Sequence, residues 1–97
     1  SIEDNKLGGW YSYRAAKAAL NQIVKSFSIE LSRSHPKACL LAIHPGTVDT
    51  NLTHRYASKH PTKTPKEAAQ NILDVTLTKD SSHTGRFYDW ANEEIPW

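Results

Sequence analysis

Tyr13 and Lys17 are the residues of this chain whose types and spacing suit joint chemistry. They stand four positions apart, and positions i and i+4 lie on one face of a helix. A phenol with a pKa of about 10 is a poor proton donor at neutral pH, but a neighbouring ammonium lowers that pKa. The pair is therefore a candidate general acid with its helper. Four Tyr and eight Lys in 97 residues give this spacing about one third of the time by chance, so a solvated helix pair is the alternative.

Residues 11–34 are predicted to form the long helix that carries this pair. Their apolar side chains recur at steps of three and four, which is typical of one helix face. These residues are Ala16, Leu20, Ile23, Val24, Phe27 and Leu31. His35-Pro36 ends the helix, because the residue before a proline avoids helical conformation. Gly8-Gly9 precedes it as a flexible hinge.

Residues 38–43 are predicted to form a strand buried on both faces, because none of their six side chains is polar. Such a strand implies a parallel sheet covered by helices, and Cys39 within it is expected to act as a small hydrophobe. His44 is expected to be a hydrogen-bonding residue at the strand end. The turn that follows is where open parallel sheets bind ligands. We interpret the polar residues 47–63 after it as a lid.

A second helix is predicted to begin after Thr64, where three start signals coincide. Thr64 supplies the N-cap hydroxyl, Pro65 takes the first helical position and Glu67 completes a capping box. The helix is expected to run to Lys79 on an apolar face. That face consists of Ala68, Ala69, Ile72, Leu73, Val75 and Leu77.

The end of the chain is predicted to add a loop at residues 80–85, a short strand at 86–90 and an aromatic terminus, 95–97, that packs onto the body. The fold class is therefore α/β, with the order helix, strand, lid, helix, strand. Two parallel strands leave most of their faces and edges unpaired. We expect residues 1–97 to be a single partial domain, the C-terminal portion of a Rossmann-like, doubly wound parallel sheet.

Composition excludes several classes of protein. The chain is 38% hydrophobic and 23% charged with a net charge of +2, which is typical of a globular protein. Lys and Arg form no stripe and no apolar run has the length of a membrane span, so neither nucleic acid nor membrane is expected as a partner. The His residues and the single Cys lack metal-ligand spacing, so no metal site is expected. One Cys cannot form an internal disulfide, which favours a reducing, cytoplasmic location.

Two segments resemble the signatures of the short-chain dehydrogenases/reductases. Tyr13-Arg14-Ala15-Ala16-Lys17 is similar to Tyr-x-x-x-Lys, and Pro45-Gly46-Thr47-Val48-Asp49-Thr50 is similar to Pro-Gly-x-x-x-Thr. The resemblance is closer still to the branch that contains the C-factor and the sniffer-type carbonyl reductases. That branch is matched by Ser1-Ile2-Glu3-Asp4-Asn5, Gly8-Gly9-Trp10-Tyr11-Ser12-Tyr13, Lys17-Ala18-Ala19-Leu20-Asn21 and Ile95-Pro96-Trp97. The resemblance covers essentially the whole chain, which corresponds to the C-terminal part of the family fold.

The resemblance implies an NAD(P)-dependent oxidoreductase that reduces a carbonyl or oxidises an alcohol by hydride transfer. Tyr13 would be the acid and base and contribute to cofactor binding, and Lys17 would also bind the nicotinamide ribose. From the residues alone, Trp10 is expected to border the substrate pocket or to be a core residue, and Tyr11 to be a wall of that pocket or a packing residue. The implied substrate is a small carbonyl compound or alcohol.

The turn after the buried strand would hold the nicotinamide carboxamide, as the resemblance implies. The backbone of Val48 and the hydroxyl of Thr50 would bind it, while Pro45 and Gly46 shape the turn for close backbone approach. For Arg14, the sequence leaves open a ligand contact and a surface charge.

The chain lacks the Gly-rich phosphate-binding turn with which family members begin, so the adenosine half of the cofactor has no site in it. We expect the chain to continue a longer protein and to be inactive alone. NAD and NADP both stay open, and so does the position of the catalytic Ser, at Ser1 or upstream. A homodimer or homotetramer through the helix near Tyr11 is also implied by the resemblance. The alternative function is a non-catalytic, truncated relative that serves as an association module.

Overall fold

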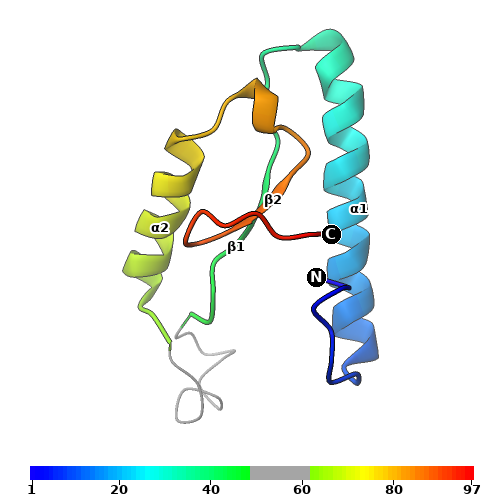
Figure 1. Cartoon of the computed structure of the whole chain (residues 1–97), viewed down its shortest axis with the longest axis vertical. Helices are drawn as coiled ribbons and strands as arrows, with labels where there is room; N and C mark the ends of the chain where they lie inside the picture. Colours follow the sequence, from blue (N-terminus) through cyan, green and yellow to red (C-terminus); the bar gives the residue numbers. More distant parts are fainter. Residues whose placement is uncertain (49–61) are drawn as a thin grey trace.

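The computed structural model describes residues 1–48 and 62–97. It contains the helices α1 (Tyr11–Ser34) and α2 (Pro65–Leu77), the strands β1 (Ala42–His44) and β2 (Phe87–Asp89) and the short 3₁₀ helix η2 (Ser81–His83). Along the chain the order is α1, β1, α2, η2, β2 (Figure 1). The predicted α/β class is confirmed. Most of the segment interpreted as a lid lies outside the described residues.

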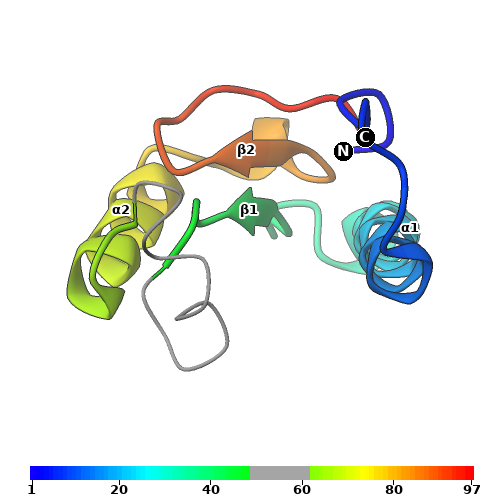
Figure 2. The ribbon, with the colours of Figure 1, turned by 90° about the horizontal axis from the view of Figure 1, so that it is seen from below.

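β1 and β2 form a parallel pair, as predicted, in which Ala42 lies opposite Phe87 and His44 opposite Asp89. The two helices lie on opposite sides of this pair, which is the arrangement of a doubly wound sheet (Figure 2). Because the strands run in the same direction, His44 and Asp89 end them at the same edge. The turn after His44 therefore starts at the carboxyl edge of the sheet.

β1 is shorter and less buried than predicted. Only Ala42, Ile43 and His44 pair with β2, because β2 itself is three residues long. Upstream of the ladder, the Leu40 amide donates to Oγ1 of Thr84 at 2.9 Å, so residues 38–41 are not part of the strand. The expected burial on both faces is wrong: β1 is half-buried or exposed, and Cys39 is exposed. Two strands alone do not cover each other's faces, which explains the difference.

The bounds predicted for α1 are confirmed, but its apolar residues do not all face the body of the protein. Val24 and Leu31 are half-buried on the inner side, where Ser28 is fully buried. Leu20, Ile23 and Phe27 are 49%, 63% and 50% exposed. These three residues form an open apolar stripe along α1.

The chain exposes more surface than a self-contained protein of its mass. Its accessible surface is 7342 Å² at 10.9 kDa, whereas a monomer of this mass exposes about 5,600 Å². Among the described residues, the apolar side chains that are buried are Ala68, Val75, Phe87 and Tyr88. The excess of roughly 1,700 Å² agrees with a fold that needs a further covering layer.

Ser28 and Gly85 set how closely α1 approaches the strands. Ser28 donates its hydroxyl to the Lys25 carbonyl at 2.7 Å and lies buried against the loop before β2. Gly85 has a φ of +77°, and a Cβ built on it would lie 2.5 Å from Oγ of Ser28. A side chain at position 85 would therefore push α1 away from the sheet.

The predicted start of α2 is confirmed. The Thr64 hydroxyl accepts a hydrogen bond from the Glu67 amide at 3.1 Å, and Pro65 is the first helical residue. The helix ends at Leu77, two residues before the predicted end, and Thr78 follows as its C-cap.

The aromatic terminus packs onto the body, as predicted. The ring of Trp97 stacks on that of Phe87 with their centroids 5.4 Å apart. The Ile2 amide donates to the Trp97 carbonyl at 3.1 Å, so the two ends of the chain meet beside α1 (Figures 1 and 2).

Gly85→Ala is expected to lower the free energy of unfolding by about 1–3 kcal/mol more than Gly8→Ala, measured by urea denaturation. Both glycines have a positive φ, but a Cβ at Gly8 would meet no atom within 4 Å. The backbone strain is therefore common to both variants, and their difference isolates the contact with Ser28. Equal losses of unfolding free energy in the two variants would contradict the conclusion that a side chain at position 85 pushes α1 away from the sheet.

Candidate functional site

A cavity of about 730 Å³ between α1 and β1 brings the two predicted motifs together. Tyr13 and Lys17 line it from α1, and Pro45 and Gly46 line it from the turn after β1. The described wall contains the cations of Arg14 and Lys17 but no carboxylate, so it suits a ligand that carries negative charge.

Tyr13 and Lys17 face each other as their spacing predicts. Nζ of Lys17 lies 5.6 Å from the centroid of the Tyr13 ring, within the range of a cation–π contact. Tyr13 is 55% exposed, so its phenol is accessible from the cavity side of α1. The ring of Trp10 meets that of Tyr13 edge to face, with centroids 5.9 Å apart and planes at 82°.

The turn after β1 requires glycine at position 46. Gly46 has a φ of +80°, and a Cβ there would lie 3.0 Å from Cδ1 of Trp90 and 3.1 Å from Nζ of Lys63. The Gly46 amide donates to Nδ1 of His44 at 2.9 Å, which confirms His44 as a hydrogen-bonding residue at the strand end. The turn is thus held from within by His44 and packed against Lys63 and Trp90.

Lys63 supports this turn in two ways. Its amide donates to the Thr47 carbonyl at 3.0 Å, and its ammonium lies 3.5 Å from the centroid of the Trp90 ring. That ammonium is buried without a hydrogen-bond partner among the described residues. Contact with the indole face offsets part of the cost of removing the charge from water.

The remaining predicted site residues lie in different places. Trp10 and Tyr11 are 59% and 85% exposed and are not among the residues that line the cavity, and Val48 forms an isolated parallel bridge with Lys63. Thr50 lies outside the described residues. Ser1 lines the same cavity as Tyr13, and its hydroxyl accepts a hydrogen bond from the Asp4 amide at 3.2 Å.

Arg14 and Lys63 are site residues whose roles the sequence did not indicate. Arg14 is half-buried, and its guanidinium donates to the carbonyls of Gly8 and Gly9. In the sequence, the role of Arg14 could have been inferred from its position directly after Tyr13 and five residues after Gly9. Lys63 meets Gly46 only through the fold, so no local pattern marks it.

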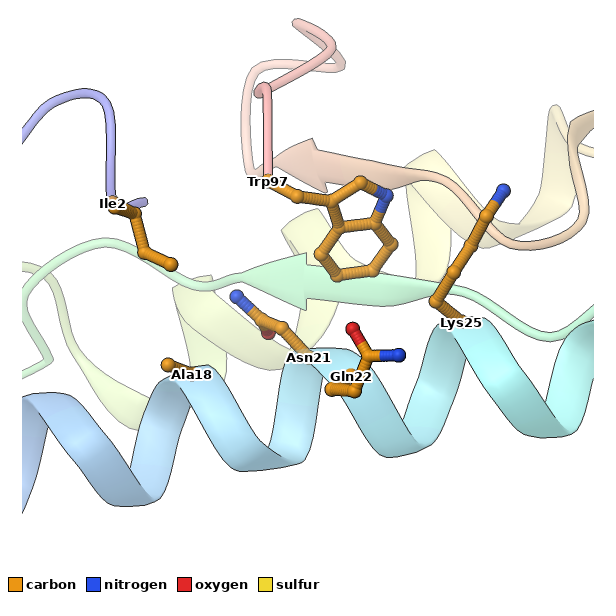
Figure 3. A pocket seen from close by; sticks show the side chains of 6 residues that line it. All are labelled: Ile2, Ala18, Asn21, Gln22, Lys25 and Trp97. Atoms are coloured by element: carbon orange, nitrogen blue, oxygen red, sulfur yellow. The ribbon is translucent and has the colours of Figure 1, made fainter.

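A smaller cavity of about 150 Å³ lies between α1 and the C-terminus (Figure 3). Asn21, Gln22 and Lys25 of α1 face the Trp97 ring across it. Its described lining contains no acidic side chain in contact with a basic one. The cavity lies where the C-terminus packs against α1.

Two curated relatives are similar over the whole of this chain. One is the 1-hydroxy-2-glutathionyl-2-methyl-3-butene dehydrogenase of Rhodococcus sp. strain AD45, at 35% identity over 97 residues and 42% of its own length. The other is the C-signal protein of Myxococcus xanthus, at 35% identity and 55% of its length. The chain therefore spans about half the length of these relatives. No family model matches it.

Two solved structures share the fold. The carbonyl reductase Sniffer of D. melanogaster superimposes with a TM-score of 0.85 at 28% identity, over all of this chain and 37% of that one. An NADPH-bound carbonyl reductase from chicken fatty liver superimposes with a TM-score of 0.81 at 29% identity, over all of this chain and 38% of that one.

The fold is thus that of the C-terminal part of Rossmann-type oxidoreductases. More narrowly, the relatives confirm the resemblance to the short-chain dehydrogenases/reductases, in the branch of the C-factor and the sniffer-type carbonyl reductases. This chain matches their C-terminal part.

Within residues 1–48 and 62–97, no three His, Cys, Asp or Glu side chains gather as a metal site would require. In the same part of the chain, no helix is both long and apolar enough to cross a bilayer.

His44 is expected to make stability depend on pH. Loss of surrounding water lowers the pKa of His44 from its ordinary value of 6.5. The positive charges of the N-terminal ammonium and Lys63 lower this pKa further, whereas the negative charge of Asp89 raises it. The unfolded chain then binds more protons just below pH 6.5, so the free energy of unfolding falls as the pH falls. The stability advantage of wild type over His44→Gln should shrink between pH 7.5 and 5 in urea denaturation. A constant or growing advantage would contradict the lowered pKa.

Proposed function

We propose that this chain supplies the catalytic end of an NAD(P)-dependent, short-chain-type oxidoreductase that reduces a carbonyl or oxidises an alcohol. The observation that carries the proposal is the shared cavity, where Tyr13 and Lys17 lie with Pro45 and Gly46. The similarity to two solved carbonyl reductases, one of them NADPH-bound, supports it.

Tyr13 is the proposed acid and base. Its hydroxyl donates a proton to the carbonyl oxygen during reduction and takes one back from the alcohol during oxidation. Lys17, one helical turn away, favours the phenolate by its charge and also binds the nicotinamide ribose hydroxyls. When bound, the nicotinamide supplies or accepts the hydride.

The turn residues fit the nicotinamide end of such a cofactor. Gly46 has no Cβ, so the backbone at the cavity wall can approach a flat ring closely. In the proposal, the backbone of Val48 and the hydroxyl of Thr50 hold the carboxamide. The proposal applies equally to NADP and to NAD as the cofactor. It also includes a small-molecule substrate and a cytoplasmic location.

A nucleotide-binding half must be added for activity in this proposal. The chain spans 37–38% of the solved neighbours, and its exposed surface leaves room for a covering layer. The stripe Leu20, Ile23 and Phe27 is open to that layer or to a second copy of α1 in a dimer or tetramer. The same stripe favours the second candidate function, a non-catalytic association module.

A chimera separates these two functions. The N-terminal part of Sniffer, up to the start of the similarity, is placed before Ser1 and assayed for NADPH-dependent reduction of a carbonyl substrate of Sniffer. Tyr13→Phe is expected to lower kcat by at least about 100-fold, because it removes the general acid. NADPH affinity should stay within about twofold, and Tyr11→Phe, which changes an exposed phenol, should retain activity.

Retained activity in Tyr13→Phe would remove Tyr13 from its proposed role. A folded chimera that binds NADPH and reduces no carbonyl would favour the association module.

The isolated chain is expected not to bind the cofactor. Titration of NADPH with Ser1–Trp97 should leave the nucleotide fluorescence unchanged, because no phosphate-binding Gly-rich turn is present in its sequence. Tight binding would contradict the need for a second half. The chimera, titrated in parallel, is the positive control.

A further inference from the structure

Three consecutive residues before α1 adopt left-handed backbone conformations. The φ angles of Gly8, Gly9 and Trp10 are +67°, +68° and +53°. Glycine adopts this region freely, but a residue with a Cβ loses about 1–2 kcal/mol there. Trp10 is also the N-cap of α1 and makes no side-chain capping bond. Other contacts must therefore hold this conformation.

The side chain of Arg14 supplies two of these contacts. Its Nε donates to the Gly9 carbonyl at 2.9 Å and its Nη2 donates to the Gly8 carbonyl at 3.3 Å. The planar guanidinium presents several donors in a fixed fork, which suits two adjacent carbonyls better than a lysine ammonium does. From the other side, the Gly8 amide donates to Oδ1 of Asn5 at 3.0 Å.

The position of Arg14 is unfavourable for the helix itself. It is the fourth residue of α1, and the first turn contains no acidic residue. A cation at this positive end of the helix dipole typically loses about 0.3–1 kcal/mol, whereas Arg33 in the last turn is favourably placed. Helix stability therefore does not explain Arg14, but its bonds to the two carbonyls do.

The conformation that Arg14 holds fixes the indole of Trp10 beside the phenol of Tyr13. The two rings meet edge to face at 5.9 Å, so Trp10 lies against the ring of the proposed acid, although it is not among the residues that line the cavity. We infer that Arg14 is a positioning residue that sets Trp10 as an aromatic wall beside Tyr13 and so selects carbonyl substrates with an apolar or aromatic group. This inference rests on the proposed function.

The first test is amide hydrogen exchange in the chimera. Arg14→Ala is expected to speed exchange across residues 8–11 about tenfold, because two bonds that restrain this segment are lost. Arg33→Ala removes an arginine from the other end of α1 and should leave these amides unchanged. If Arg14 were only a surface charge, Arg14→Ala would relieve the dipole and slow exchange in the first turn. Slower or unchanged exchange would therefore overturn the inference.

The second test is kinetic and uses an aromatic ketone and a small aliphatic one. Arg14→Ala should raise KM for the aromatic ketone about tenfold, change KM for the aliphatic ketone less and leave kcat within about twofold. Arg14→Lys should recover part of the loss. Trp10→Ala should raise KM for the aromatic ketone to a similar extent. The double variant should have a KM no higher than that of Trp10→Ala, because Arg14 acts on the substrate only through Trp10.

Additive effects of the two variants, or equal losses for both ketones, would overturn the inference. Faster exchange in Arg14→Ala together with an inactive chimera would overturn the proposed function alone.

Discussion

The close contact of α1 with Gly85 is the constraint on which the candidate site depends. The phenol and the ammonium belong to α1, whereas the turn belongs to β1, and the cavity exists because these elements lie at a fixed distance. Ser28 is the one α1 residue buried completely, and it is buried where position 85 has no side chain. Interiors pack too densely to absorb even one additional methyl group without movement. The missing Cβ at position 85 therefore lets α1 lie close to the sheet at Ser28.

Three cations surround the site, and each has a different environment. Lys17 faces a phenol, Arg14 binds two backbone carbonyls, and Lys63 lies on an indole. The ion pairs that the structure shows in its described part, His83 with Asp80 and Arg86 with Glu94, involve none of them. Within residues 1–48 and 62–97, none of the three cations forms an ion pair, so their charges favour a positive potential in the cavity.

The parts of the fold that local sequence determines were predicted well. The bounds of α1 follow from its periodicity and from Pro36, and the start of α2 follows from Thr64 and Pro65. Burial was predicted less well, because the exposure of Cys39 and Leu20 depends on which layers surround them. The proposed catalytic pair and the turn were found from motifs, whereas the contacts of Lys63 with Gly46 and Trp90 exist only in three dimensions. A single sequence contains no local signal for such contacts.

The pairing of β1 with β2 also has a consequence for the order of folding. It joins Ala42 to Phe87, which are 45 positions apart (87 − 42), with α2 between them. Closing a loop of this length costs about 3 kcal/mol of chain entropy before the pairing contributes anything. Helices need only local contacts, so α1 and α2 can form first. The turn that begins at His44 acquires its shape only when the strands pair, so the cavity is assembled at the end of folding.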